Sequence, residues 1–205
     1  MKRYFITGIG TGVGKTIVSA IFVEAFKADY WKPIQAGNLK CTDSDIVKGL
    51  IGNDISKFHP EAYKFKTPVS PHFAGELENI NIIPDKIILP QTKNHLIIEG
   101  AGGLMVPLCK NFLMIDLIKK LNAEVIIVSQ NYLGSINHTI LSVEALRSRS
   151  IPLKGVVFSG ERNESSENYI LEYTGIPCIL RVGQEQGLNK LSILKYSEIL
   201  KTSFI

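Results

Sequence analysis

The sequence predicts an α/β fold in which a mostly parallel β-sheet carries helices on both faces. Two observations predict it. Short apolar runs alternate with amphipathic stretches from one end of the chain to the other, a rhythm typical of strands that alternate with crossover helices. The 205 residues, 45% of them hydrophobic, continue this pattern without a repeat, a low-complexity tract or a linker. Residues 1–205 are therefore expected to form a single domain.

Six short apolar runs are predicted as strands. Several are apolar on both faces, as a strand buried between two helical layers must be. In chain order they are residues 3–7, 30–34, 96–99, 125–128, 155–158 and 178–181. Ligands bind at the carboxyl ends of the strands in such sheets, so the loops that follow these runs are expected to carry the functional residues.

The amphipathic stretches between these runs are predicted as helices. They cover residues 15–27, 44–51, 115–121, 136–147, 166–174 and 191–200. A shorter apolar segment, residues 85–89, is bracketed by Pro84 and Pro90 and is also predicted to be helical.

Charge and cysteine content argue against several classes of function. The net charge of +4 comes from 23 basic and 19 acidic residues, which are scattered rather than interleaved with aromatic residues as in nucleic-acid-binding surfaces. Cys41, Cys109 and Cys178 are widely spaced and indicate neither a disulfide framework nor a zinc site. The first strand follows no charged leader, and no apolar run approaches the roughly 20 residues of a membrane span. A cytoplasmic protein without nucleic-acid or membrane partners is expected.

The strongest motif is a glycine-rich turn after the first predicted strand. Residues 7–16 read T-G-I-G-T-G-V-G-K-T, which is close to the phosphate-binding pattern G-x-x-x-x-G-K-[S/T] but one residue longer between Gly8 and Gly14. Main-chain N–H groups of such a loop surround a phosphate, Lys15 reaches the terminal phosphates, and the Thr16 hydroxyl can ligate Mg²⁺. A glycine-rich turn with an incidental lysine is the alternative. The preceding strand and the following apolar helix favour a nucleotide-binding fold of P-loop NTPase type.

Three further charged residues are candidates for the same crevice. Lys32 follows a predicted strand that reads Asp-Tyr-Trp, where a second ammonium group beside Lys15 would neutralise charge on a γ-phosphoryl group. An ordinary surface lysine is the alternative. Asp43 and Asp45 stand just before a predicted helix. One of them is expected to cap that helix, which leaves the other free to bind Mg²⁺.

A strand that ends in an acid is a second signal for a phosphate site. Residues 95–103 read H-L-I-I-E-G-A-G-G and place Glu99 where P-loop enzymes hold a carboxylate opposite the loop. A buried acid there needs a cation or hydrogen-bond donors, which favours a metal-linked role. Residues 134–138 open another predicted helix, whose N–H groups could bind a carboxylate or a phosphate; an ordinary helix start is the equal alternative. His72 and His138 have no paired carboxylate or cysteine that would indicate a catalytic triad.

Together these motifs resemble the dethiobiotin synthetase family, ATP-dependent enzymes of biotin biosynthesis. The resemblance extends through most of the chain, and its most specific segments are P-V-S-P-H and E-G-A-G-G. The matching residues are T-G-x-x-T-x-V-G-K-T at 7–16, Lys-Pro-Ile with a following Gly at 32–37, Asp45 ahead of a helix, P-V-S-P-H at 68–72, E-G-A-G-G at 99–103 and L-G-S-I-N-H at 133–138.

The resemblance implies a homodimer with active sites at the subunit interface. Its substrates would be 7,8-diaminononanoate, CO2 (or bicarbonate) and ATP with Mg²⁺, joined through a carbamate and a carbamic-phosphoric anhydride. By the same resemblance, Lys15 and Lys32 are the catalytic residues, and Thr16, Asp45 and Glu99 hold Mg²⁺. The residues expected at ATP are Gly12, Val13, Gly14, Lys15, Thr16, Ile17, Asp45, Glu99, Gly100, Ala101 and Gly102. The residues expected at the diamine are Thr11, Lys32 and, across the dimer, Gly134, Ser135 and Asn137.

Three positions depart from the pattern of that family. Ala36 stands where the family usually has a Ser or Thr that hydrogen-bonds the substrate, and Gln35 is beside it. Ser159 and Gly160 stand where the family commonly has Asn-Asp, whose Asn reads the adenine edge, so the preference for ATP over other nucleoside triphosphates stays open. Gly12 replaces an acidic residue, a change that the loop should tolerate.

Three other functions fit the loop less well. Switch ATPases of the partitioning class carry an extra lysine near the start of the loop, whereas Lys15 is the only lysine here. Cobyrinate-type amide synthetases carry an appended glutaminase, for which 205 residues leave no room. Small-molecule kinases need a lid rich in arginine, and residues 104–115 contain none.

Overall fold

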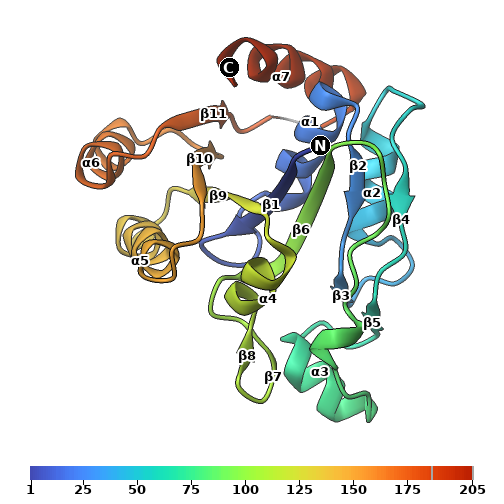
Figure 1. The fold of residues 1–205 in the computed structure, drawn as a ribbon. Coiled ribbons are helices and arrows are strands. Elements are labelled where there is room, and N and C mark those ends of the chain that lie inside the picture. The colour runs from blue at the N-terminus through green and yellow to red at the C-terminus, as the bar shows by residue number, and fades with distance from the viewer. Residues whose placement is uncertain (186, 205) are drawn as a thin grey trace.

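The α/β prediction is confirmed by a computed structural model, which describes residues 1–185 and 187–204. Within these residues seven parallel strands form one sheet in the order β11-β10-β9-β1-β6-β2-β4. Figure 1 shows β1 and β6 side by side near the middle of this sheet. The strands are β1 (Arg3–Gly8), β2 (Asp29–Trp31), β4 (Phe58–His59), β6 (Leu96–Gly103), β9 (Glu124–Gln130), β10 (Leu153–Ser159) and β11 (Cys178–Val182).

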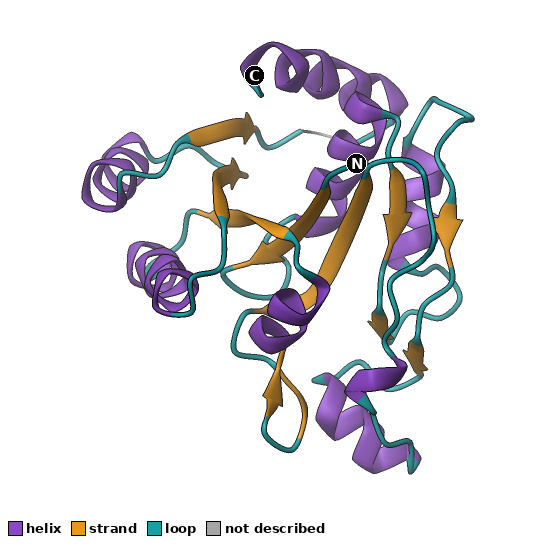
Figure 2. Ribbon diagram, in the orientation of Figure 1, coloured by secondary structure: helices purple, strands orange, loops and turns teal. Residues whose placement is uncertain are grey.

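Helices cover both faces of the sheet (Figure 2). One face carries α1 (Lys15–Phe26), α2 (Asp43–Leu50) and α7 (Lys190–Ser203). The other carries α3 (Pro71–Glu78), α4 (Met114–Leu121), α5 (Ser135–Ser148) and α6 (Glu164–Thr174). In β1 the side chains alternate between the two apolar clusters, because successive residues of a strand point to opposite faces: Tyr4 and Ile6 lie in one cluster and Phe5 in the other. None of the helices in the described part of the chain is both long enough and apolar enough to cross a bilayer.

Two short strand pairs lie outside the main sheet. β3 (Ile34–Ala36) pairs in parallel with β5 (Tyr63–Phe65), and β7 (Pro107–Cys109) pairs antiparallel with β8 (Phe112–Leu113). The sequence pattern did not predict these strands, β4 or α3. Strands of two or three residues are too short to show a hydrophobic period that stands out from their surroundings.

Two predicted elements differ from the structure. The strand expected over residues 30–34 is divided, because β2 ends at Trp31 and β3 begins at Ile34. Pro33 has no N–H to donate to a strand ladder, and the chain leaves the main sheet there. Of residues 85–89 only the start is helical, as a 3₁₀ turn over Pro84–Lys86. Ile87 follows this turn with an exposed fraction of 1% and packs into the core.

Candidate active site

The glycine-rich turn forms a tight loop between β1 and α1. Gly12 and Gly14 have φ angles of 77° and 93°, a region that glycine adopts without strain. A Cβ on Gly8 would stand 2.6 Å from Val13 Cγ2, so the loop closes on itself where Gly8 lies. α1 begins directly after Gly14, and no side chain caps its N-terminus. The loop therefore presents main-chain N–H groups and the positive end of a helix to an anion.

Glu99 is the centre of a buried hydrogen-bond network at the carboxyl end of β6. Its exposed fraction is 1%. Its carboxylate accepts hydrogen bonds from Thr16 Oγ1 at 2.9 Å, from the Tyr30 hydroxyl at 2.9 Å and from Lys32 Nζ at 3.0 Å. These donors come from α1, β2 and the residue after β2, which the parallel pairing of β6 with β1 and β2 brings together. Lys32 also donates to Gly100 O at 3.2 Å and pairs with Asp43 Oδ2 at 2.5 Å.

The charges in this network stabilise one another. Burial would raise the pKa of Glu99, but the Lys32 ammonium and the hydrogen bonds to the carboxylate hold this pKa below its usual value. Burial would lower the pKa of Lys32, but Glu99 and Asp43 outweigh it and raise this pKa. Lys32 and Glu99 are therefore a buried ion pair, cation and carboxylate, at neutral pH.

Lys15 has a different electrostatic environment. Its exposed fraction is 7%, and its Nζ donates to the Gly10 carbonyl at 2.8 Å. Burial, together with repulsion from Lys32, lowers the pKa of Lys15 to about 8. A bound polyphosphate would place negative charge beside Lys15 and so favour its ammonium form.

The two aspartates at the start of α2 have different partners. Asp45, predicted to bind Mg²⁺, is the third residue of the helix, and its Oδ2 accepts hydrogen bonds from Thr42 N and Thr42 Oγ1, each at 2.8 Å. It completes a capping box. Asp43 is the aspartate that lies in the network with Lys32. The reason is the start of the helix at Asp43, which puts Asp45 at the position that reaches back to Thr42.

A cleft of about 660 Å³ opens over the loop and the Glu99 network. Most of the predicted site residues line it, namely Thr11, Gly12, Gly14, Lys15, Thr16, Ile17, Lys32, Glu99, Ala101 and Gly102. Three of the residues predicted to lie at ATP do not. Val13 is packed beneath the loop, Asp45 caps α2, and Gly100 takes part through the carbonyl that accepts from Lys32.

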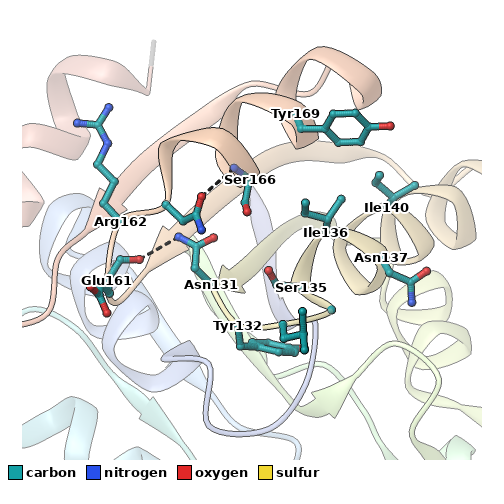
Figure 3. Close-up of a pocket in the computed structure, with 13 residues that line it drawn as sticks. Asn131, Tyr132, Ser135, Ile136, Asn137, Ile140, Glu161, Arg162, Ser166 and Tyr169 are labelled. Atoms are coloured by element: carbon teal, nitrogen blue, oxygen red, sulfur yellow. Dashed lines mark hydrogen bonds between the residues drawn. The ribbon is translucent and has the colours of Figure 1, made fainter.

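The residues predicted to receive a substrate carboxylate lie elsewhere. Gly134, Ser135 and Asn137, at the start of α5, line a separate pocket of about 820 Å³ between α5 and α6. Figure 3 shows Ser135 and Asn137 in this pocket, together with Arg162 and Tyr169 from the opposite wall. No residue of the glycine-rich loop lines it. Within one chain the structure does not bring these residues to the loop.

The departures from the family pattern lie at the cleft or against the glycine-rich loop. Ala36 and Gln35 both line it. Gln35 does not offer a free side chain in place of the missing hydroxyl, because its Nε2 donates to Gly37 O at 3.0 Å and its Oε1 accepts from Asp43 N at 3.4 Å. Ser159 lies against the loop, since a Cβ on Gly14 would stand 2.7 Å from Ser159 Oγ.

The sequence interpretation missed two polar residues of the site. Tyr30 was taken only as part of a strand, yet its hydroxyl holds Glu99. Ser70 was noted only within P-V-S-P-H, yet it lines the cleft. Ser70 could have been found from its place directly before Pro71, because a polar residue followed by proline is typical of a helix start. No local pattern marks Tyr30.

The donors at the cleft suit a hard cation. Thr16, Asp43 and Glu99 supply oxygen atoms only, and the described residues contain no cluster of three or more His, Cys, Asp or Glu arranged for a metal ion. Mg²⁺ needs few protein oxygens because phosphate oxygens and waters complete its octahedron. The residues present therefore fit a magnesium ion bound together with a nucleotide.

Comparisons with known proteins agree with this geometry. A family model described as "AAA domain" matches residues 2–192. The chain is 50% identical over 198 residues to the "ATP-dependent dethiobiotin synthetase BioD" of Cytophaga hutchinsonii, which covers 96% of each chain. It is 49% identical over 197 residues to the protein of the same name from Christiangramia forsetii, over 96% of this chain and 95% of that one.

A solved structure shares the fold. The septum site-determining protein MinD from Pyrococcus horikoshii, complexed with Mg-ADP, superposes with a TM-score of 0.59 at 14% identity, over 97% of this chain and 95% of that chain. At this identity the likeness concerns the fold alone. The sequence matches go further, since they cover nearly the whole chain at about half identity, and the chain belongs to the ATP-dependent dethiobiotin synthetase family.

Proposed function

We propose that this protein converts 7,8-diaminononanoate, CO2 and ATP to dethiobiotin, ADP and phosphate, through a carbamate and a carbamic-phosphoric anhydride. The observation that carries the proposal is the convergence of Lys15, Lys32 and the glycine-rich loop on one cleft, with Glu99 buried beneath them. This reaction needs no protein nucleophile, because one substrate amine attacks CO2 and the other closes the ring. It needs positioning and charge stabilisation, which this cleft supplies.

The loop is proposed to bind the polyphosphate of ATP. Main-chain N–H groups of Gly12–Thr16 and the N-terminus of α1 would surround the phosphate oxygens. Lys15 would leave the Gly10 carbonyl and turn to the β- and γ-phosphates. Thr16, Glu99 and an aspartate at the start of α2 would hold Mg²⁺, which screens the phosphate charge when it is bound.

Lys32 is proposed to hold the reacting groups. Its ammonium group is fixed by Glu99, Asp43 and the Gly100 carbonyl. In this position it would stabilise the negative charge of the carbamate and of the γ-phosphoryl group as they approach each other. Thr11, which also lines the cleft, would contact the diamine.

The substrate carboxylate is proposed to bind at the second subunit of a homodimer. Gly134, Ser135 and Asn137 line a pocket apart from the cleft of their own chain. The N–H groups at the start of α5 would bind a carboxylate that reaches over from a neighbouring cleft.

The reaction uses small, soluble substrates, which fits a cytoplasmic enzyme.

The proposal is tested by phosphate release from the purified protein. Release should require the diamine, bicarbonate and MgATP together, and dethiobiotin should form in equal amount. Phosphate release at the same rate without the diamine would instead indicate a switch ATPase. A panel of nucleoside triphosphates in the same assay measures the preference for ATP that Ser159 and Gly160 leave open.

A further inference from the structure

Ser70 and His72 form a hydrogen-bonded pair at the edge of the cleft. Ser70 lines the cleft and is the N-cap residue of α3. Serine at this position usually accepts a hydrogen bond from the first turn of the helix. Here its side chain makes no such bond, and Ser70 Oγ lies 3.0 Å from His72 Nδ1 instead. The Ser70 hydroxyl therefore contacts the His72 imidazole and does not cap the helix.

The proposed reaction requires a proton acceptor at the cleft. An alkylamine is an ammonium ion at neutral pH, with a pKa of about 10.4 in the lysine side chain. It must lose one proton to become a nucleophile, and a second as the C–N bond to CO2 forms. Each step needs a group that can accept the proton and is not already engaged in an ion pair or in phosphate binding.

The ionisable groups that line the cleft in the described chain are already engaged. They are Lys15, Lys32, Asp43 and Glu99. Lys32 is the cation between the Asp43 and Glu99 carboxylates, and Glu99 also accepts from Thr16 and Tyr30. Lys15 would be held as an ammonium group by the polyphosphate. The imidazole that Ser70 contacts lies outside this network and has a ring nitrogen that can accept a proton.

We propose that Ser70 and His72 form a proton relay for the substrate amine; the inference rests on the proposed function. The ammonium group gives a proton to Ser70 Oγ while the Ser70 hydroxyl gives its own proton to the lone pair on His72 Nδ1. The lone pair left on nitrogen forms the C–N bond to CO2 as one C=O electron pair moves onto oxygen, and the second N–H proton then leaves by the same path to give the carbamate anion. After each transfer His72 carries a proton on both ring nitrogens and gives one to water, and exchange with solvent restores the tautomer whose Nδ1 can accept from Ser70. Ser70 contacts the substrate, and His72 is a positioning residue that acts through it.

The surroundings of His72 suit this role. The imidazole is partly exposed, so that a proton can pass from it to water. The strands packed against α3 are β3, β5 and β7, and their titratable residues are Tyr63, Lys64 and Cys109. α3 itself carries Glu76 and Glu78, and Glu78 accepts from Thr67 N at 2.9 Å. No ion pair involves His72 within the described residues.

The test is the pH dependence of kcat/KM for the diamine in His72→Gln. At pH 7 we expect a loss of about 100-fold, which is a usual contribution of a general base. The loss should shrink to about tenfold or less by pH 9, because the fraction of free amine rises about tenfold per pH unit below the pKa of the amine. Ser70→Ala should give the same profile, and the double variant should be no worse than either single one, since the two residues act as a unit.

Controls separate this role from a structural one. Nucleotide affinity should be unchanged in both single variants, and His95→Gln, at the opposite end of β6, should match the wild type. A loss that is equal at pH 7 and pH 9, or no loss, would overturn the relay. Where His72→Gln does not fold, Ser70→Ala carries the same test, since it removes a single oxygen atom. Failure of the wild type to release phosphate with the diamine would instead refute the proposed function.

Discussion

Glu99 is a carboxylate with 1% exposure whose charge depends on its neighbours. A buried charge is tolerated when it is paired and hydrogen-bonded, and it is costly when one partner is removed. Lys32 Nζ, Thr16 Oγ1 and the Tyr30 hydroxyl supply these partners. The network therefore couples the stability of the site to its chemistry. Lys32, which would hold the reacting phosphoryl group, also keeps the Glu99 carboxylate beneath it ionised.

Replacing Lys32 separates the two roles. Lys32→Ala should lower kcat by two or more orders of magnitude while it leaves nucleotide affinity mostly intact. It should also lower the free energy of unfolding by about 3–5 kcal/mol, because Glu99 is left as a buried charge without its cation. The double variant Lys32→Ala/Glu99→Gln should recover much of that stability but none of the activity. Steady-state kinetics and urea denaturation measure the two effects, and normal turnover by Lys32→Ala would remove this residue from the mechanism.

Variants of the two aspartates of α2 should differ in the Mg²⁺ concentration that their activity requires. Asp43 lies beside Lys32, and Asp45 caps the helix through Thr42. Asp43→Asn should therefore raise the Mg²⁺ concentration needed for half-maximal activity more than Asp45→Asn does. Asp45→Ala should instead lower the stability of the helix and of the protein, because it removes the partner of Thr42 in the capping box. Titrating activity with Mg²⁺ in both variants measures this difference. A larger Mg²⁺ requirement in Asp45→Asn would indicate that Asp45 is the metal ligand.

At the scale of elements, the outer edge of the sheet depends on one acid. β4 has only two residues, and its pairing with β2 is reinforced by Asp29, whose exposed fraction is 2%. The Asp29 carboxylate accepts from Thr92 Oγ1 at 2.7 Å and from Lys57 N at 3.0 Å, and it contacts His59 Nε2 at 3.1 Å. These contacts join β2 to β4 and to the segment before β6.

The Asp29 contacts should make this edge sensitive to acid. Burial would raise the pKa of Asp29, but the hydrogen bonds to Thr92, Lys57, His59 and Asn94 outweigh it and hold this pKa below its usual value. Stability from a lowered carboxyl pKa is present above the unfolded-state value of about 3.9 and is lost as pH falls through the folded-state value.

The corresponding variant is Asp29→Asn. It should reduce the free energy of unfolding at pH 7 by about 1–3 kcal/mol, with a difference from the wild type that narrows below pH 4. Urea denaturation across pH 3 to 7 measures this. The exposed Asp54→Asn serves as the matched control, and a difference that stays constant down to pH 3 would contradict the assignment.

At the scale of the whole molecule, the two ends of the proposed substrate site lie in different pockets. Between them an apolar groove of about 840 Å³ runs along α5 and the loop after β6, with Leu141 58% exposed and Met105 50% exposed. Thr11 and Val106 line both this groove and the cleft. A second subunit over this groove would complete the site that one chain leaves divided.

This arrangement predicts that the protein is a dimer and that the dimer is required for activity. Sedimentation should give twice the mass of one chain. Leu141→Asp should shift it to the monomer and raise KM for the diamine at least tenfold with little change in nucleotide affinity. Leu191→Asp, on α7 with 76% exposure, should remain dimeric. A wild-type monomer that turns over the diamine at full rate would contradict the proposed shared site.

Local patterns in the chain accounted for much of the site. Residues 7–16 and 95–103 identified the loop and Glu99 because glycine spacing and an acid at the end of an apolar strand are properties of contiguous residues. The choice between Asp43 and Asp45 was different. Both precede the same helix, and only the residue at which α2 begins decides which of them reaches Thr42. The pair formed by Ser70 and His72 depended in the same way on where α3 begins.

The amino-acid sequence by itself determined the parallel α/β fold and the glycine-rich loop, which follow from the alternation of apolar runs and from local spacing, and its motifs identified the family by resemblance. Only the tertiary structure decided that Tyr30 joins Lys32 at Glu99, and that the start of α5 lies outside the cleft. The physical reason is register. Glu99 meets Lys32 and Thr16 across 67 and 83 positions of the chain, and parallel strand pairing sets these distances where no local pattern can.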